Sequence, residues 1–262
     1  MNRTHPTRFF YVVVLTIAAG AFVPVLLFDK SIFTMANGWH SSLADRTWLI
    51  LTAMGDGLVL GIIVGAFIVK NPRVVAMGIP LLLLTSLTVN IIKAIFPSLR
   101  PVQVLDAVHV LGPLLRSGSF PSGHAAAAMA AGLSIAFYGS SRLTGLLAVF
   151  IAFLIGISRI FVGAHFPKDV LAGMVCAFVL FLIVKPLFVP FIENRIPDRP
   201  SFRGKTFWAA FWLEIIAALF TMFIYGPYYS ELAAVPMFVA AVVLIWIAVR
   251  YKSALEGSGL VF

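Results

Sequence analysis

The stretch LTGLLAVFIAFLIGISRIFVGA, residues 143–164, carries a single charged side chain, Arg159, close to its end. A helix of about 20 mainly apolar residues is long enough to cross the hydrocarbon layer of a membrane. A continuous apolar run favours a helix over a barrel strand, which would alternate, and lipid offers no water to backbone groups left unpaired. The stretch therefore predicts a transmembrane helix.

The rest of the chain repeats this composition. Hydrophobic residues make up 61% of its 262 residues and charged residues 11%, whereas soluble domains average roughly 45–50% apolar and about 25% charged residues. Seven further apolar stretches approach the length of a span, at residues 9–28, 48–69, 74–95, 122–138, 169–190, 207–226 and 232–250. The sequence therefore predicts an all-α fold, a polytopic membrane helical bundle of about eight spans.

Polar connections divide these spans into three parts. Residues 191–206 hold two prolines and several basic side chains, and we interpret them as a basic cytoplasmic loop. Residues 1–190 then form a six-helix core, and residues 207–262 form a C-terminal two-helix appendage. The connection at 29–47 is rich in aromatic and polar residues, which is typical either of a short helix at the outer membrane interface or of a loop.

Basic residues also predict the orientation, because Lys and Arg are more frequent in cytoplasmic loops. If the N-terminus is cytoplasmic, twelve of the nineteen Lys and Arg residues lie on that side and seven on the other. Arg3 and Arg8 before the first apolar run resemble the start of a signal peptide, but this run is long enough to span and we expect it to stay uncleaved. We expect a multi-pass protein of the cell inner membrane with both termini in the cytoplasm.

The net charge of +9 raises the question of a nucleic-acid partner. The basic residues are scattered through short loops and form no single basic arm, so we expect no nucleic-acid binding. Cys176 is the only cysteine, which excludes an intramolecular disulfide bond and a cysteine metal cluster.

Three polar motifs interrupt the apolar pattern. The first is KAIFPSLRP, residues 93–101, at the outer end of the third predicted span. Lys93 and Arg100 could both reach one phosphate, the Arg bidentately and the Lys as a point charge. Taken alone, this motif is also typical of a lysine that anchors a helix end and of an ordinary loop arginine.

The second motif is SFPSGH, residues 119–124, which opens the fourth predicted span. Pro121 suits a helix start, so the amides of Ser122, Gly123 and His124 are expected to point out of the helix end and attract an anion. Gly123 lets an oxyanion approach the backbone, and the Ser122 hydroxyl could donate a further hydrogen bond. An ordinary capped helix with an interfacial histidine fits this segment equally well.

The third motif is SRIFVGAHFPKD, residues 158–169, between the fifth and sixth predicted spans. We expect Asp169 to accept a hydrogen bond from one ring nitrogen of His165, which leaves the other nitrogen neutral and nucleophilic. An acidic residue in a first helical turn beside an incidental histidine is the alternative. The predicted orientation places all three motifs on one extracytoplasmic face, a set suited to binding and transferring a tetrahedral dianion.

In order and internal spacing the three motifs resemble the signature motifs of the type 2 phosphatidic acid phosphatase (PAP2) superfamily. The resemblance covers about residues 50–190 and implies a six-helix core, catalysis without a metal or another cofactor, and a lipid phosphate substrate. Phosphatidic acid, phosphatidylglycerol phosphate, undecaprenyl pyrophosphate and lipid A phosphate are the substrate types that it implies. It does not cover the last two predicted spans.

The resulting hypothesis is a two-step phosphoryl transfer. His165 attacks phosphorus to give a phosphohistidine, and His124 protonates the departing lipid oxygen and then activates the water that releases phosphate. Asp169 orients His165. The groups expected to hold the phosphate oxygens are Lys93, Arg100, Arg159, Ser122 and Gly123.

Several charged residues lie outside the motifs. Asp56, flanked by glycines in the second predicted span, is costly in lipid unless it faces the bundle or water, so a substrate contact and a structural hydrogen bond are weighed equally. Glu214 in the seventh predicted span, with Asp106, His109 and Arg116, could shape headgroup selection, although simple solvation is favoured for the three residues of the 96–121 connection.

Other functions stay open at this point. A phosphotransferase would discharge the same phosphohistidine onto a second lipid. A lipid transporter or flippase predicts charges near mid-membrane or broken helices, which Asp56 and Glu214 fit weakly. A catalytically inactive protein of the same fold is opposed by the intact His124, His165 and Asp169. The sequence predicts no oligomeric state.

Overall fold

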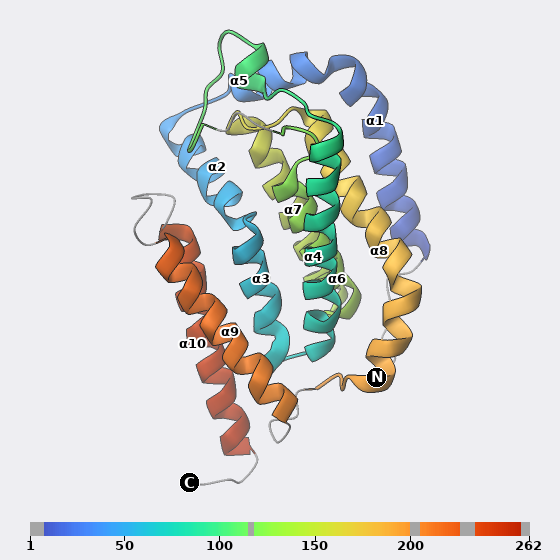
Figure 1. Ribbon diagram of the computed structural model, residues 1–262, viewed down its shortest axis with the longest axis vertical. Coiled ribbons are helices and arrows are strands. Elements are labelled where there is room, and N and C mark those ends of the chain that lie inside the picture. Colours follow the sequence, from blue (N-terminus) through green and yellow to red (C-terminus); the bar gives the residue numbers. More distant parts are fainter. Residues whose placement is uncertain (1–7, 115–117, 200–204, 226–233, 258–262) are drawn as a thin grey trace.

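The computed structural model of the protein describes residues 8–114, 118–199, 205–225 and 234–257, and the regular structure in these ranges is helical. Among these described residues, three helices are long and apolar enough to cross a membrane: α4 (Pro72–Ile95), α7 (Arg142–Phe161) and α8 (Pro167–Arg195). Figure 1 shows all three running roughly along the long axis of the molecule. The prediction of an all-α membrane bundle is confirmed in this form.

Helix α6 (Gly123–Tyr138) packs against α4, α7 and α8. Alanines and Gly132 cover much of its surface and are buried. The packing is close, because a Cβ atom on Gly132 would lie 3.1 Å from the Ala148 carbonyl oxygen of α7, and one on Gly173 of α8 would collide with the carbonyl oxygen of Ser122. Small residues let helices approach this closely in membranes, so the start of α6 is held tightly against α8.

The second predicted span is not one continuous helix. It consists of α2 (Ser42–Met54), α3 (Gly57–Gly65) and the short 3-10 helix η1 (Ala66–Val69), with a bend of 66° at the break. Asp56 was expected inside this span. Instead it is the N-cap residue of α3, and its carboxylate accepts a hydrogen bond of 2.8 Å from the Leu58 amide. Two glycines around a good N-cap residue explain the break.

The predicted connection at 29–47 is mostly helical. Helix α1 (Arg8–Asn37) continues through it beyond a kink at Phe28, and α2 begins at Ser42, where the Ser41 hydroxyl accepts a hydrogen bond from the Ala44 amide. Of the two interpretations left open, the helical one is therefore confirmed, whereas its place at the interface stays a prediction. The 96–121 connection contains the short helix α5 (Pro101–Val104).

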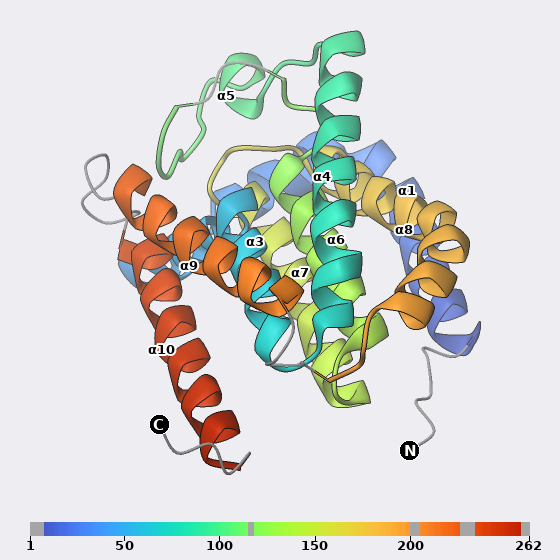
Figure 2. The same ribbon diagram turned by 60° about the horizontal axis from the view of Figure 1, so that its bottom comes forward.

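Helices α9 (Lys205–Tyr225) and α10 (Ala234–Gly257) pack against each other and against α3 and η1. Figures 1 and 2 show the pair on one side of the bundle, opposite α1 and α8. Their buried contacts form a second apolar cluster, which includes Ile62, Phe211, Ala218, Ala240 and Ile247. The apolar parts of α6, α9 and α10 described here are shorter than a full span, so the count of eight spans and the division at residues 191–206 stay predictions.

Candidate active site

The three sequence motifs lie at one end of the bundle, the upper end in Figure 1. This end gathers the C-terminal ends of α4 and α7, the N-terminal ends of α6 and α8, and helix α5. The sequence-predicted residues on these elements or in the turns next to them are Lys93, Arg100, Ser122, Gly123, His124, Arg159, His165 and Asp169. The fold therefore places motifs far apart in the sequence at the same end of neighbouring helices.

Arg100 connects the first and third motifs. Its Nη1 donates a hydrogen bond of 2.8 Å to the Ala164 carbonyl oxygen and lies 3.4 Å from His165 Nε2. Its Nη2 donates a bond of 3.3 Å to the carbonyl oxygen of Gly118, which also accepts a bond of 2.9 Å from Lys93 Nζ. Two cations are thus held beside one imidazole by backbone carbonyls.

His165 is almost completely buried, and its two ring nitrogens face different groups. Nδ1 lies 3.5 Å from the Ser119 hydroxyl and 3.7 Å from Asp169 Oδ2, and Ser119 donates a short hydrogen bond of 2.6 Å to that carboxylate oxygen. The expected direct hydrogen bond from His165 to Asp169 is therefore replaced by a path through Ser119. A neutral ring with its proton on Nδ1 leaves the Nε2 lone pair directed towards Arg100.

Burial and surrounding charge act on His165 in the same direction. Burial lowers the pKa of His165 well below its ordinary value of 6.5, and the charges of Arg159, Arg100 and Lys93 lower it further. Burial also lowers the pKa of Arg100, but a guanidinium keeps its charge across the physiological range. The site therefore combines an uncharged imidazole with neighbouring fixed positive charges.

The lowered pKa of His165 predicts a pH-dependent stability. As the pH falls below about 6.5, the unfolded chain takes up a proton that folded His165 does not, so the free energy of unfolding should fall by up to about 1.4 kcal/mol per pH unit. Thermal unfolding of the detergent-purified protein between about pH 7.5 and 5.5 measures this. His165→Asn should remove the His165 contribution and so reduce the slope, and identical profiles for both proteins would contradict the assignment.

His124 and Arg159 line a cavity of about 340 Å³. An Arg159 Nη1 hydrogen bond to the Thr52 hydroxyl of α2 holds the guanidinium in place. Within the described part of the chain, Arg159 Nε is buried and has no hydrogen-bond partner. A buried donor of this kind at a cavity wall is suited to an oxyanion, which would satisfy it.

Most of the cavity wall is apolar, and its polar residues are few. Asp56 and Thr52 stand at the α2–α3 break, and Pro236 comes from α10 of the appendage. The other lining residues are Ala53, Val102, Val110, Leu111, Pro113, Leu114, Val162, Gly163 and Ala164, which carry apolar side chains or, for Gly163, none. Such a cavity offers room for an apolar chain beside a polar group.

Two sequence expectations at the start of α6 differ from the structure. The Ser122 amide is not free but donates a hydrogen bond of 2.8 Å to the Asp169 carbonyl oxygen. The Ser122 hydroxyl is fully buried and caps α6 by accepting from the Ala125 amide at 3.5 Å. The close packing of α6 on α8 explains both, and leaves Gly123 and His124 in the first turn, where amides lack partners inside the helix.

The remaining candidates lie elsewhere. Glu214 is buried against Gly65 of α3 and does not line the cavity. His109 bonds to Asp45, and neither it nor Asp106 is among the lining residues. Arg116 lies outside the described residues. Ser119 belongs to the second motif, but the sequence predicted no role for it. Thr52 was not predicted at all, because no local sequence pattern marks it.

The sequence profile of the PAP2 superfamily matches residues 74–193. The chain is 33% identical over 132 residues to undecaprenyl-diphosphatase BcrC of Bacillus subtilis strain 168, a match that covers 45% of this chain and 67% of that protein. Phosphatidylglycerophosphatase B of the same organism is 37% identical over 78 residues, 26% of this chain and 38% of the relative. The crystal structure of Aquifex aeolicus LpxE superposes with a TM-score of 0.57 at 28% identity, covering 61% of this chain and 95% of that one.

All three motifs fall inside the matched residues 74–193, whereas the α2–α3 break and the C-terminal pair of helices fall outside them. The identity to BcrC extends over two thirds of that relative. The LpxE likeness agrees in fold over most of that protein's length. The chain belongs to the PAP2 superfamily.

Proposed function

We propose that the protein is a membrane lipid phosphatase that removes phosphate from a lipid phosphate or diphosphate through a phosphohistidine on His165. The observation that carries the proposal is the position of His165 Nε2, 3.4 Å from Arg100 Nη1, in a ring kept uncharged by burial among cations. A neutral imidazole nitrogen beside fixed positive charge is a nucleophile directed at an anionic centre.

In the first step His165 Nε2 attacks phosphorus. The bond from phosphorus to the lipid oxygen breaks, and His124 at the cavity wall gives a proton to that oxygen. In the second step water gives a proton to His124 and attacks the phosphohistidine, so that inorganic phosphate leaves and both imidazoles return to their starting states. Ser119 and Asp169 act on the Nδ1 side, where they keep the ring oriented and take up its positive character.

Positive side chains would bind the transferring group. Arg100 and Arg159 supply two fixed charges, Lys93 supplies an amine beside them, and the unpaired Nε of Arg159 supplies a donor next to the cavity. The Gly123 amide at the start of α6 is a further donor. These groups take the role that Mg²⁺ has at other phosphoryl-transfer sites, so we expect turnover to need no metal ion.

A lipid substrate fits the composition of the cavity. Its apolar wall suits acyl or polyprenyl chains, and His124 and Arg159 provide polar groups at the same wall, whereas His165 is buried behind it. The similar proteins from Bacillus subtilis are an undecaprenyl-diphosphatase and a phosphatidylglycerophosphatase, which makes these two lipid classes the first to test. Asp56, at the same wall, is placed to accept a hydrogen bond from a substrate hydroxyl. We further propose that the site opens to the extracytoplasmic face of the inner membrane.

Broken helices such as α2–α3 also occur in transporters, where the breaks lie near mid-membrane and bind substrates. Here the break serves the phosphate site. Thr52 binds the Arg159 guanidinium, and a Cβ on Gly55 would lie 2.5 Å from Ile155 and 3.3 Å from His124. The break thus lets α2 approach α7 and His124, which favours an enzyme over a transporter.

The test is phosphate release by detergent-purified protein in the presence of EDTA. The substrates are phosphatidic acid, phosphatidylglycerol phosphate, undecaprenyl pyrophosphate and lipid A phosphate. We expect release from at least one of them with no loss in chelator. Absence of release from all four by folded protein would overturn the hydrolase assignment, and release that appears only with an added acceptor lipid would indicate a phosphotransferase.

A further inference from the structure

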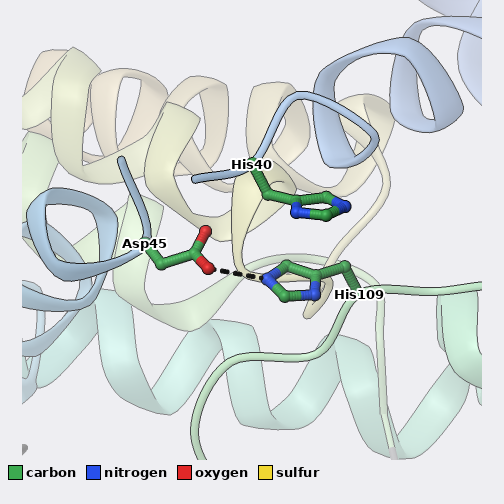
Figure 3. A group of neighbouring side chains, drawn as sticks. All are labelled: His40, Asp45 and His109. Atoms are coloured by element: carbon green, nitrogen blue, oxygen red, sulfur yellow. Dashed lines mark hydrogen bonds and ion pairs between the residues drawn. The ribbon is translucent and has the colours of Figure 1, made fainter. Parts of the chain in front are cut away.

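A second group of polar side chains lies outside the phosphate site. It consists of His40 from the α1–α2 connection, Asp45 from the first turn of α2, and His109 from the segment after α5, as Figure 3 shows. His109 Nε2 lies 3.1 Å from Asp45 Oδ2, and the His40 ring stacks on the His109 ring with centroids 4.3 Å apart. One nitrogen or oxygen atom from each of the three lies within 4.8 Å of the others.

We propose that His40, Asp45 and His109 bind a divalent transition metal ion of the Zn²⁺ class. Two imidazoles and a carboxylate are ligands that Zn²⁺ takes, at about 2.0–2.2 Å in tetrahedral geometry. Ligand atoms at these distances and angles lie about 3.3 Å apart. The 3.1 Å between His109 and Asp45 already matches that spacing.

His109 is held in place independently of any ion. The Asn37 side chain accepts a hydrogen bond of 2.9 Å from the His109 amide and donates one of 2.8 Å to its carbonyl oxygen. The Asn37 side-chain nitrogen also donates a hydrogen bond of 3.0 Å to the Phe161 carbonyl oxygen at the end of α7. Asn37 is buried, so this clamp fixes one ligand and limits the reorganisation that binding requires.

His40 is the ligand that must move. The angle between the two ring planes is only 18°, so the nitrogen lone pairs of the two imidazoles lie in nearly parallel planes. In this arrangement both rings cannot bind one ion. His40 is exposed and lies in the short connection between Asn37 and Ser42, so its side chain is the one that would rotate out of the stack on His109. A shift of about 1.5 Å brings its nitrogen to tetrahedral spacing.

The ion would fasten a segment that reaches the phosphate site. The Leu111 amide donates a hydrogen bond of 3.1 Å to the Val162 carbonyl oxygen, and a Cβ on Gly163 would lie 2.6 Å from the His109 carbonyl oxygen. Val110 and Leu111 line the cavity, whereas none of the three ligands does. The ion would therefore stabilise the cavity wall from outside and take no part in phosphoryl transfer.

The test measures metal binding directly, without substrate. Protein purified with an affinity tag free of histidine is stripped with a chelator, desalted and titrated with Zn²⁺ in competition with a chromophoric chelator. We expect one tight site per chain, and a visible absorption band of tetrahedral Co²⁺ when cobalt replaces zinc. His40→Ala, Asp45→Asn and His109→Ala should each weaken binding by at least about tenfold, since even outer-shell changes reach that size.

His5→Ala is the matched control, since it removes a histidine outside the group, and it should leave the affinity unchanged. His40→Ala is the decisive variant, because an exposed side chain can be removed without disturbing the fold. The absence of a tight site, unchanged affinity in His40→Ala and His109→Ala, or an equal loss in His5→Ala would each overturn the proposal. Because no substrate is present, these outcomes are independent of whether the protein hydrolyses lipid phosphates.

Discussion

His165→Ala is expected to reduce phosphate release at least about a thousandfold, because it removes the nucleophile and leaves water as the only acceptor. The loss should appear in kcat, since the cations that bind the phosphate group remain. The measurement is steady-state phosphate release from the best lipid substrate, with the unfolding temperature and the size-exclusion profile in detergent as checks on folding. Activity near that of the unchanged protein would refute the phosphohistidine mechanism.

His124→Ala separates the two steps and is the matched partner of this variant. A lipid diphosphate leaves as a phosphate, which needs less protonation than an alkoxide, so His165 should still be phosphorylated. Hydrolysis should stall because no base activates water. With a radiolabelled terminal phosphate, His124→Ala should accumulate an acid-labile, base-stable phosphoenzyme and His165→Ala should form none; label in His165→Ala would place the intermediate on another residue.

Arg100→Lys should lower kcat/KM by about a hundredfold to a thousandfold, although the charge is retained, which is the size of effect seen when one transition-state donor is lost. The guanidinium bonds two carbonyl oxygens and lies beside His165 Nε2 at the same time. One ammonium group cannot reproduce this planar, forked geometry. The measurement is kcat/KM on a single lipid substrate in detergent micelles of fixed composition.

Arg73→Lys is the control for this substitution. Arg73 also donates to two carbonyl oxygens, those of Ile196 at 2.8 Å and Glu193 at 3.2 Å, but it joins the N-terminal end of α4 to the C-terminal end of α8. It should change stability more than kcat/KM. Equal losses of activity in the two variants would show that Arg100 acts only through folding.

Composition and span length predict the helices well, because lipid leaves a chain little choice of secondary structure. The break between α2 and α3 was not predicted, because hydropathy averages over the segment whereas Gly55, Asp56 and Gly57 act locally through capping. A span count taken from apolar length alone passes over such a break. The same limit applies to the kink of α1, which lies at Phe28, four residues after Pro24 and not at a proline or glycine itself.

The site was predicted where its residues lie in short motifs. Lys93, Arg100 and His165 meet because their helix ends share one face, which follows from alternating span direction. The contacts that were missed depend on tertiary geometry. Ser119 meets His165 and Asp169 across 46 and 50 positions of sequence, and Thr52 meets Arg159 across 107 positions.

The close approach of Gly173 to the Ser122 carbonyl oxygen fixes the distance between α6 and α8 at the candidate active site. Because there is no space for one methyl group between α6 and α8, the segment that carries His124 and the segment that carries His165 and Asp169 have a fixed separation. In the proposed mechanism the substrate phosphorus lies between these two histidines, so this packing would set the separation that a headgroup has to fit. We therefore expect lipids whose headgroup linkage cannot bring phosphorus to that position to be poor substrates.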